Sequence, residues 1–565
     1  SAKVLYGLNN ENTSRDSYIP SDVYYALQRK SRGNLGYGKR QQSTLEGTLT
    51  FQHKFGELLD MNLMAGMGRY LDSGDGSDIS YENANDHIQG SSVGMADGPF
   101  YPTSYKYKNE KRSQFVRGSF DLFGRYVVSA SLRRDGTDKF FPSKKYAFFP
   151  SVSLAWKMNE ESFIKNISWI NMLKLRASYG ETGSDNLGTT LYGIVTTTRE
   201  DVQFNNNSVT YIPYILSGAN YEDVTWQKTV MKNIGLDFSI FRDRIWGSVD
   251  VFRNDVTHLL GTAPTELLGM HGTRPINGGH YKRTGVDVSL NSLNLQTHDF
   301  KWTSQITMSH YNAVWIERMP NYDYQKYQKR KNEPMNAFYY YKTTDIIDVD
   351  KSNMPESQRS LGPAACMPGY PIVEDKNGDG IIDVNDSYMD NMLPKLYFGF
   401  GNTFTWKNFD LDIFMYGQLG VKKWNDAYSY SADAGNLSRG VDAHNVGIYS
   451  YNIWNTQTNM NGHFPGIAIS KSVALPENLG FDYTRENASY VRVRNITLGY
   501  NLGPKELSIF KGYIRGIRVF VDFQNPLTFT KYKGYDPEIN TSSSNLTGGQ
   551  YPQMRVYSIG AKLTF

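Results

Sequence analysis

Apolar and polar residues alternate with a period of two in many separate segments of this chain. In the segment VMKNIGLDFSI, one face takes Val230, Ile234, Leu236, Phe238 and Ile240. The opposite face takes polar residues and glycine, and the same alternation recurs at 126–133, 173–179, 286–290, 409–418 and 557–565. Each segment is about nine to eleven residues long, which is the length that a tilted strand needs to cross a bilayer. The pattern predicts an all-β chain that forms a transmembrane antiparallel β-barrel.

Short turns and long polar stretches separate these segments. Tight turns are expected around Gly124 in FDLFGRYVV and around Asp243 in SIFRDRIWG. Long loops are expected at 68–111, 184–222, 316–395 and 420–487, which are rich in Asn, Asp, Ser, Gly and Tyr. Short turns at one end and long loops at the other are typical of outer-membrane barrels. The segments amount to roughly fourteen to sixteen strands.

A soluble β-sandwich or propeller is the alternative, although its strands are usually only about five or six residues long.

Composition removes several other classes of protein. The mean hydropathy is −0.53, and no run of eighteen or more apolar residues occurs, which excludes a transmembrane helix but not a barrel. A net charge of +4 over 565 residues gives no reason to expect nucleic-acid binding. Cys366 is the single cysteine, so no internal disulfide can form. The chain starts at Ser1 without a signal segment, and we expect it to be a mature piece or a fragment.

The sequence contains no recognisable catalytic arrangement. The histidines form no His-Glu-x-x-His pair, and no Gly-x-Ser-x-Gly turn is present. The glycine-rich segment YGETGSDNLG lacks the Lys-Ser or Lys-Thr ending of a phosphate-binding loop. We therefore expect no enzyme activity.

One segment, DKNGDGIIDVND, fits the template of a twelve-residue calcium loop. Its oxygen ligands would come from the side chains or backbone of Asp375, Asn377, Asp379, Ile381, Asp383 and Asp386. Gly380 would permit the sharp turn, and an aspartate at the last position is shorter than the usual glutamate. The sequence predicts a structural Ca²⁺ site here; a solvated Asp/Asn/Gly turn without metal is the alternative.

Aromatic residues cluster in the expected loops, where their faces could contact a ligand such as a sugar ring. The candidate substrate-binding residues are Tyr339, Tyr341, Trp424, Tyr428, Tyr430 and Trp454. Aromatic residues near strand ends also form the interfacial girdles of any barrel, so the pattern alone does not separate the two roles.

From about residue 113 onward a series of longer motifs follows in a fixed order. They include SLRRDGTDKFFPSKKYAFFPSVSLAWKMNEESF, LKLRASYGETGSDNLG, INGGHYKRTGVDVSL, EDKNGDGIIDVNDSYMDNMLPKLYFGFGN, ASYVRVRNITLGYNL and RVFVDFQNPLTFTKYKGYDPE. Through these motifs the chain resembles the SusC/RagA family of TonB-dependent outer-membrane transporters of Bacteroidetes. The chain departs from the family pattern at Gln227, where Glu is more usual, and at Tyr340, where the family has Gly. The segments cover about four-fifths of the chain, and their order makes accidental agreement very unlikely.

The resemblance implies a barrel of about twenty-two strands in the full protein, with an N-terminal plug domain in its lumen. No plug and no TonB box are visible in this sequence. The implied function is TonB-dependent import of oligosaccharides or oligopeptides across the outer membrane of a Gram-negative cell. A SusD-like surface lipoprotein would be the partner.

Two other functions stay open. A surface barrel acting as an adhesin or assembly scaffold would bind a partner through its long loops without energised transport. A soluble Ca²⁺-dependent carbohydrate-binding protein would need the apolar faces of the strands to be buried inside the protein.

Overall fold

The computed structural model contains one large antiparallel sheet of 16 strands that follow each other almost in chain order. These strands are β1 (Ala2–Ile19), β2 (Arg32–Phe55), β3 (Leu59–Glu82), β4 (Phe100–Leu122), β5 (Tyr126–Thr137), β6 (Tyr146–Lys157), β7 (Ile170–Ser184), β12 (Gln227–Ile240), β13 (Ile245–Pro264), β14 (Thr273–Gln296), β15 (Phe300–Glu317), β20 (Leu396–Trp406), β21 (Phe409–Leu419), β25 (Tyr490–Leu502), β26 (Gly516–Thr530) and β27 (Val556–Thr564). The sheet, which we call the wall, confirms the predicted all-β antiparallel fold.

The structure describes residues 1–564 except 21–30, 84–92, 188–196, 200–203, 207–208, 212–213, 217–221, 265–272, 321–327, 329–331, 426–451, 463, 467–474, 505, 511–512, 535 and 540–551. Among the described residues, no helix is both long enough and apolar enough to span a membrane. The one α-helix in this part of the chain is α1 (Ser162–Lys165).

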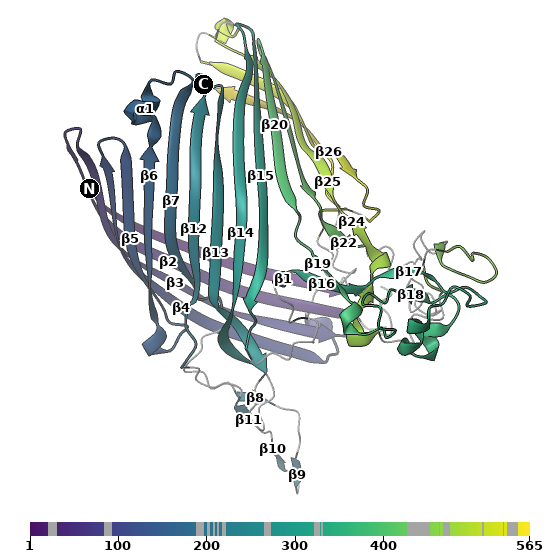
Figure 1. Cartoon of the computed structure of the whole chain (residues 1–565). Coiled ribbons are helices and arrows are strands. Elements are labelled where there is room, and N and C mark those ends of the chain that lie inside the picture. Colours follow the sequence, from purple (N-terminus) through teal and green to yellow (C-terminus); the bar gives the residue numbers. More distant parts are fainter. Residues whose placement is uncertain are drawn as a thin grey trace.

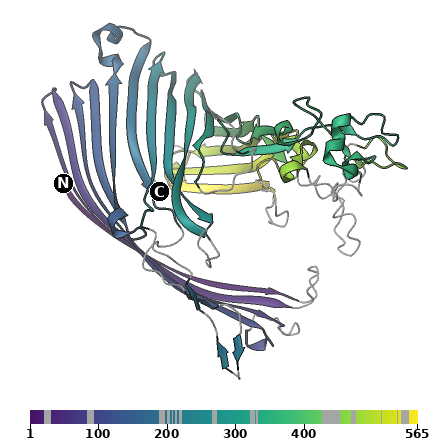
Figure 2. The same cartoon turned by 60° about the horizontal axis from the view of Figure 1, so that its bottom comes forward.

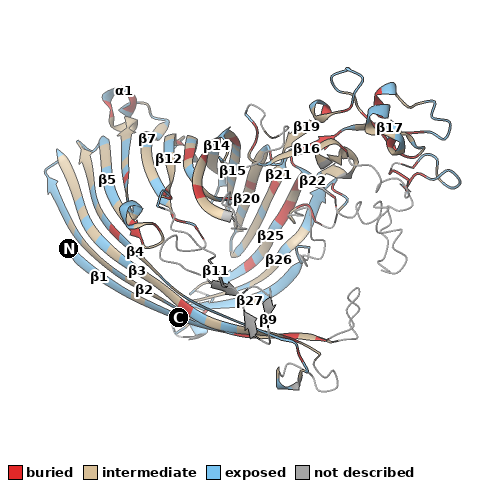
Figure 3. Cartoon of the chain, turned by 90° about the horizontal axis from the view of Figure 1, so that it is seen from below, coloured by how far each residue is buried: buried red, intermediate tan, exposed pale blue. Residues whose placement is uncertain are grey.

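The wall curves around a central space when it is viewed from below (Figure 3). Strands β5 to β15 form the near side in Figure 1, and β1 to β4 pass behind them. In the described pairing, β1 is hydrogen-bonded to β2 and β27 to β26, so these two strands are the edges of the sheet.

The two ends of the wall differ in the length of their connections. At one end tight turns join β4 to β5 and β12 to β13, as the sequence predicts around Gly124 and Asp243. Both residues have positive φ, +67° and +59° respectively. At the other end β15 stops at Glu317 and β20 begins at Leu396, while β21 stops at Leu419 and β25 begins at Tyr490. The long segments therefore gather at one end, which also carries the four short strands β8 (Thr197–Arg199), β9 (Phe204–Asn206), β10 (Val209–Tyr211) and β11 (Tyr214–Leu216).

Strand pairing places the apolar positions of neighbouring strands side by side on the outer face. Leu236 lies opposite Leu175 on one side and Val249 on the other. One row further along, Ile234 and Val251 are paired, and they are 61% and 54% exposed. Large apolar side chains that are this exposed on a continuous face indicate a surface that lies in lipid rather than in water.

Aromatic rings collect on the outer face near the short-turn end. Trp302 stacks on Phe404, Trp406 on Phe409, and Trp169 on Phe241 in the turn after β12. Rings at this level form the interfacial girdle that anchors a membrane barrel, because their apolar bodies and polar edges suit the boundary between lipid and water. The girdle marks the height at which the lipid-facing band ends.

The first strands are much longer than the expected nine to eleven residues. Strands β2 and β3 have 24 residues each and β4 has 23. The expected loop at 68–111 is therefore wrong for most of its length, because β3 continues to Glu82 and β4 begins at Phe100. The ladder from Asp72 to Ser80 has many glycine, serine and aspartate residues but stays paired with both neighbours. Beyond the lipid both faces meet water, so neither face needs apolar residues.

A smaller unit sits beyond the long-loop end of β15 and β20 (Figures 1 and 2). We call it the cap; it consists of the described residues between β15 and β20 and between β21 and β25. Its strands are β16 (Ala337–Tyr341), β17 (Thr343–Ile346), β18 (Pro371–Val373), β19 (Tyr388–Asn391), β22 (Lys422–Trp424), β23 (Gly480–Phe481) and β24 (Arg485–Asn487). Strand β16 pairs with β19 and, in parallel, with β23, which joins the two long segments.

The cap has a hydrophobic core of its own. One cluster contains Tyr341, Val373, Ile382 and Leu475, and a second contains Ile347, Ala365, Tyr370 and Ile372. Phe481 packs against both clusters. Burial of apolar side chains thus stabilises the cap in the way that it stabilises a water-soluble domain.

Candidate functional site: the inner wall and the cap

The inner face of the wall carries charged side chains that are paired across strands. The Arg176 guanidinium donates Nε–H and Nη2–H to both carboxylate oxygens of Asp237, at 2.9 and 2.7 Å, and a further bond to Asp250 at 3.1 Å. The three residues come from the adjacent strands β7, β12 and β13. Their side chains point to the face of the sheet opposite to that of Leu236, because successive side chains of a strand point to opposite faces. A two-oxygen arginine–carboxylate bond fixes both side chains and leaves a polar surface on the inner side of the wall.

The same arrangement recurs on the later strands. Arg518 donates to both oxygens of Asp410 at 3.2 and 2.5 Å, between β26 and β21. Asp522 accepts a hydrogen bond from the Thr497 hydroxyl at 2.5 Å. The inner wall is thus lined with polar groups on strands far apart in the sequence, which suits contact with water and hydrophilic solutes.

A group of aromatic rings also lies on the inner face, nearer the long-loop end. The rings of Tyr311 and Tyr397 are stacked with centroids 5.7 Å apart and planes 2° apart. The Arg283 guanidinium carbon is 3.9 Å from the Tyr311 ring centroid and 5.8 Å from that of Phe252. Flat rings beside a guanidinium can contact the apolar face of a sugar or a peptide group while the cation binds an oxygen. Sequence reasoning missed this group because only strand pairing brings its members together.

A buried ion cluster ties the end of β25 to the segment that follows β26. Arg492 donates to both oxygens of Asp536 at 2.8 and 2.9 Å and to Glu538 at 2.5 Å. The side chains of Arg492 and Asp536 are only 3% and 5% exposed. Burial by itself raises the pKa of Asp536, but hydrogen bonds from the backbone amides of Glu538 and Gln553 and from the Arg492 guanidinium lower the pKa by more, so the net shift is downward. Asp536 therefore stays charged near neutral pH.

A second charged group holds the parts of the cap together. Asp390 on β19 accepts hydrogen bonds from Arg485 at 2.8 Å, Lys422 at 3.1 Å and the Tyr340 hydroxyl at 3.2 Å. Burial raises the pKa of Asp390, but the two cations lower it more, and the net pKa is below its ordinary value. Burial and the Asp390 charge raise the pKa of Tyr340 to about 12. The group links β16 and β19 to β22 and β24, which belong to the second long segment.

The described candidates for ring contacts with a ligand are buried inside the cap. Tyr339 and Tyr341 are 8% and 0% exposed, and their hydroxyls donate to Glu333 and to the Asp383 carbonyl. Trp454 is 7% exposed and packs beside Gly369, where a Cβ atom would clash with the indole. In this arrangement none of the three rings offers an open face to a sugar. The side chain of Trp424, and all of Tyr428 and Tyr430, lie outside the described residues.

The loop predicted to bind calcium is ordered by its own hydrogen bonds. Asp375 accepts from the amides of Gly378 and Gly380 at 2.7 and 2.8 Å. Asp386 is fully buried and accepts from the amides of Lys376 and Asp383 at 2.9 and 2.8 Å.

The other predicted ligands lie on the outside of the same loop. Asp379 and Ile381 are exposed, and the Asn377 side chain donates to Asp379 at 2.8 Å. Asp383 caps a short 3-10 turn that starts at Val384. Within the described residues, no three His, Cys, Asp or Glu side chains converge as a metal site would require. In this arrangement the Asp375 and Asp386 carboxylates accept hydrogen bonds from backbone amides. Calcium binding stays a prediction.

A family model and several curated proteins match this chain. The family model described as "TonB dependent receptor-like, beta-barrel" matches residues 2–525. TonB-dependent receptor P3 of Formosa agariphila is 26% identical, covering 100% of this chain and 56% of the relative. TonB-dependent receptor SusC of Bacteroides thetaiotaomicron is 27% identical, covering 82% of this chain and 44% of the relative. The chain thus spans about half the length of these curated relatives.

The solved structure of the RagAB peptide transporter shares the fold. Its TM-score with this chain is 0.77 at 20% sequence identity, covering 100% of this chain and 60% of the solved one. These relatives are named as receptors and transporters rather than enzymes.

Proposed function

Because the chain belongs to the TonB-dependent receptor-like β-barrel family of the outer membrane, we propose that it forms the wall of an active importer of hydrophilic oligomers. The cargo would be oligosaccharides or oligopeptides. The observation that supports this most directly is the contrast between the two faces of the wall. Leu236 and Val249 face outward, whereas Arg176, Asp237 and Asp250 face the central space as a hydrogen-bonded group. A polar inner surface allows a hydrophilic cargo to pass without losing all its hydrogen bonds.

Energy for uptake would come from the TonB system through parts of the whole protein that precede this wall. A SusD-like surface lipoprotein would close the long-loop end and deliver cargo. The names of the curated relatives support TonB dependence. The cap and the long strands β2 to β4 reach beyond the lipid-facing band, where such a partner would contact them.

The aromatic group on the inner wall is the proposed place of cargo contact. Tyr311 and Tyr397 present stacked rings, and Arg283 adds a cation beside them. Rings of this kind bind the apolar face of a sugar or a peptide side chain, and the guanidinium binds hydroxyl or carbonyl oxygens. The chemistry accommodates both cargo classes, so the assay must include both.

The test is uptake of labelled oligosaccharide and oligopeptide panels by cells that carry the full-length gene, with and without a working TonB system. The proposal expects accumulation of one class that disappears when TonB is lost. The double variant Tyr311→Ala/Tyr397→Ala should reduce that uptake roughly tenfold, since each lost ring contact is worth about 0.5–1.5 kcal/mol. The control Tyr557→Ala removes an outward ring that is 64% exposed and should leave uptake unchanged.

Two outcomes would contradict the proposal. Surface binding that is unchanged by loss of TonB, with no accumulation inside, would favour an adhesin or assembly scaffold. Accumulation that does not depend on TonB would favour passive diffusion through an open pore.

A further inference from the structure

The apolar band on the outer face ends abruptly on the strands β7, β12, β13, β14 and β15. Strand register aligns one row of side chains that can all donate hydrogen bonds: Tyr179, Lys232, Arg253, Thr284 and Asn312. The next row toward the short-turn end contains Ala177, Ile234, Val251, Val286 and His310. The row after that contains Leu175, Leu236, Val249, Val288 and Met308. A donor row therefore borders a lipid-facing apolar surface.

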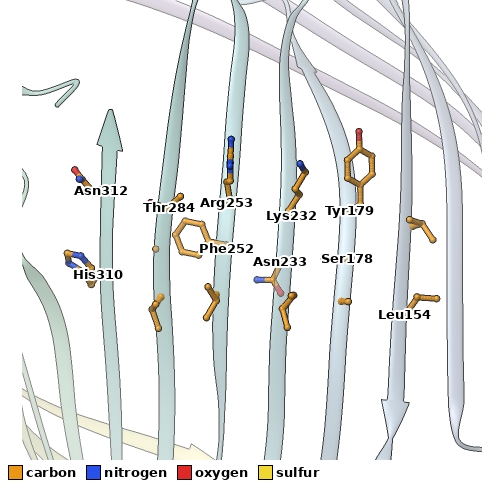
Figure 4. Close-up of a pocket in the computed structure, with 16 residues that line it drawn as sticks. Leu154, Ser178, Tyr179, Lys232, Asn233, Phe252, Arg253, Thr284, His310 and Asn312 are labelled. Atoms are coloured by element: carbon orange, nitrogen blue, oxygen red, sulfur yellow. The ribbon is translucent and has the colours of Figure 1, made fainter. Parts of the chain in front are cut away.

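The outer face is hollowed at this boundary. A depression of about 700 Å³ is lined by Lys232 and Arg253 at one level and by Leu154, Ile234 and Val286 below them. Figure 4 shows Tyr179, Lys232 and Arg253 on three neighbouring strands at the same level. The depression is thus polar along one margin and apolar over its floor.

Two cations lie side by side at this boundary, and only one of them has a carboxylate partner in the described part of the chain. Lys232 and Arg253 are directly opposite in the register of β12 and β13, and like charges in that position are destabilising. Arg253 has a carboxylate partner, Asp255, at 2.8 Å. Lys232 has no ion pair among the described residues. The next row away from the apolar band holds Glu181, which is paired with Lys228, and Asp255, which is paired with Arg253. Where the structure describes this boundary, Lys232 is therefore a cation without a carboxylate of its own.

We propose that this depression binds a phosphorylated lipid of the outer leaflet. Its phosphate would accept hydrogen bonds from Lys232 and Arg253, and its acyl chains would lie on Ile234, Val251 and Val286. The apolar floor is the reason to expect a lipid rather than a dissolved anion, because a free phosphate gains nothing from aliphatic side chains. The site lies on the face opposite the cargo path and does not depend on the proposed import.

The test is lipid binding to the detergent-solubilised full-length protein, measured by native mass spectrometry. Dioleoyl phosphatidic acid is the anionic probe, and dioleoyl phosphatidylcholine is the zwitterionic one. We expect the wild type to prefer phosphatidic acid. The double variant Lys232→Ala/Arg253→Ala should bind it roughly tenfold to thirtyfold more weakly, because each cation near a membrane surface contributes about 1 kcal/mol to binding of anionic lipid. Lys232→Arg/Arg253→Lys keeps both charges and should retain most of the affinity.

A matched control removes the same charge elsewhere. Lys351→Ala/Arg359→Ala takes two exposed cations from the cap and should leave phosphatidic acid binding unchanged. Equal affinity of the wild type for the two lipids would overturn the proposal, as would equal loss in the control. Full competition by inorganic phosphate at concentrations comparable to the lipid would also overturn it, since the site would then recognise the anion alone.

Discussion

The wall and the cap are made by the same chain but are stabilised against different surroundings. In the wall, Ile234 is 61% exposed and Val251 is 54% exposed, as expected of side chains that face lipid chains rather than other parts of the protein. In the cap, Tyr341 and Ile347 are both 0% exposed, because their neighbours are other side chains of the cap. The wall relies on its hydrogen-bonded ladder and on lipid, whereas the cap relies on a packed core. Substitutions should therefore have opposite consequences in the two regions.

The largest expected effect lies where the two regions approach each other, at the buried ion cluster of Arg492. Replacing Arg492 with Leu should cost about 3–5 kcal/mol, because the Asp536 charge would then be buried without its cation. The matched control is Arg359→Leu in the cap, which breaks an ion pair with Glu356 whose side chains are 66% and 79% exposed. That change should cost less than about 1 kcal/mol. Equal losses of unfolding free energy in a denaturant titration would contradict this assignment.

A smaller effect should separate the two faces of one strand. Val288→Arg puts a charge on the lipid side of β14 and should cost about 2–4 kcal/mol near the bilayer midplane. Ser289→Arg puts the same charge on the inner side of the same strand and should cost far less, since its surroundings are polar. The measurement is reversible folding of each variant into vesicles. The faces would be wrongly assigned if Ser289→Arg were the more damaging change.

Acid should loosen the cap through Asp390. The pKa of Asp390 is lowered in the folded cap, so its stabilising contribution is present above the ordinary aspartate pKa of about 4 and is lost as the pH falls through the lowered value. Limited proteolysis of the cap with an acid-tolerant protease, from pH 6 down to well below the ordinary aspartate pKa of about 4, should show this loss, roughly 1–2 kcal/mol. Asp390→Asn should remove the acid dependence that this group causes. Asp348→Asn, at an exposed position of the cap, should keep the acid dependence. If proteolysis of Asp390→Asn depended on pH as in the wild type, Asp390 would not be the group responsible.

The smallest expected effect concerns calcium. If residues 375–386 bind Ca²⁺ as predicted, free Ca²⁺ at about five times its dissociation constant should raise the stability of the cap by roughly 1 kcal/mol over a chelator-treated sample. Asp379→Asn should abolish the gain, and Asp345→Asn outside the loop should not. Thermal unfolding that is identical with Ca²⁺ and with chelator would refute the calcium prediction.

Alternation alone predicted the wall well, because one face of each strand must match lipid along the whole crossing. It failed for residues 68–111. There β3 continues to Glu82 and β4 begins at Phe100, so both strands extend beyond the lipid, where both of their faces meet water. The many glycine, serine and aspartate residues of this stretch predicted a loop, although the backbones of β3 and β4 stay hydrogen-bonded to each other.

The candidate site was harder to predict, because burial in the cap depends on contacts between distant segments. Tyr341 looked like an exposed loop aromatic, yet it packs against Leu475 from the other long segment. The Tyr311–Tyr397 stack was missed for the same reason, since these residues meet only through the pairing of β15 with β20.

The most direct test of the two-faced wall is cysteine scanning of four consecutive residues of β14 in a Cys366→Ser background. Single cysteines at Val286, Asp287, Val288 and Ser289 would be examined in the full-length protein in vesicles. Fluorophores at 286 and 288 should be quenched by brominated lipid, and thiols at 287 and 289 should react with a water-soluble reagent. The same response at all four positions, or the reverse alternation, would contradict a wall with lipid outside and water inside.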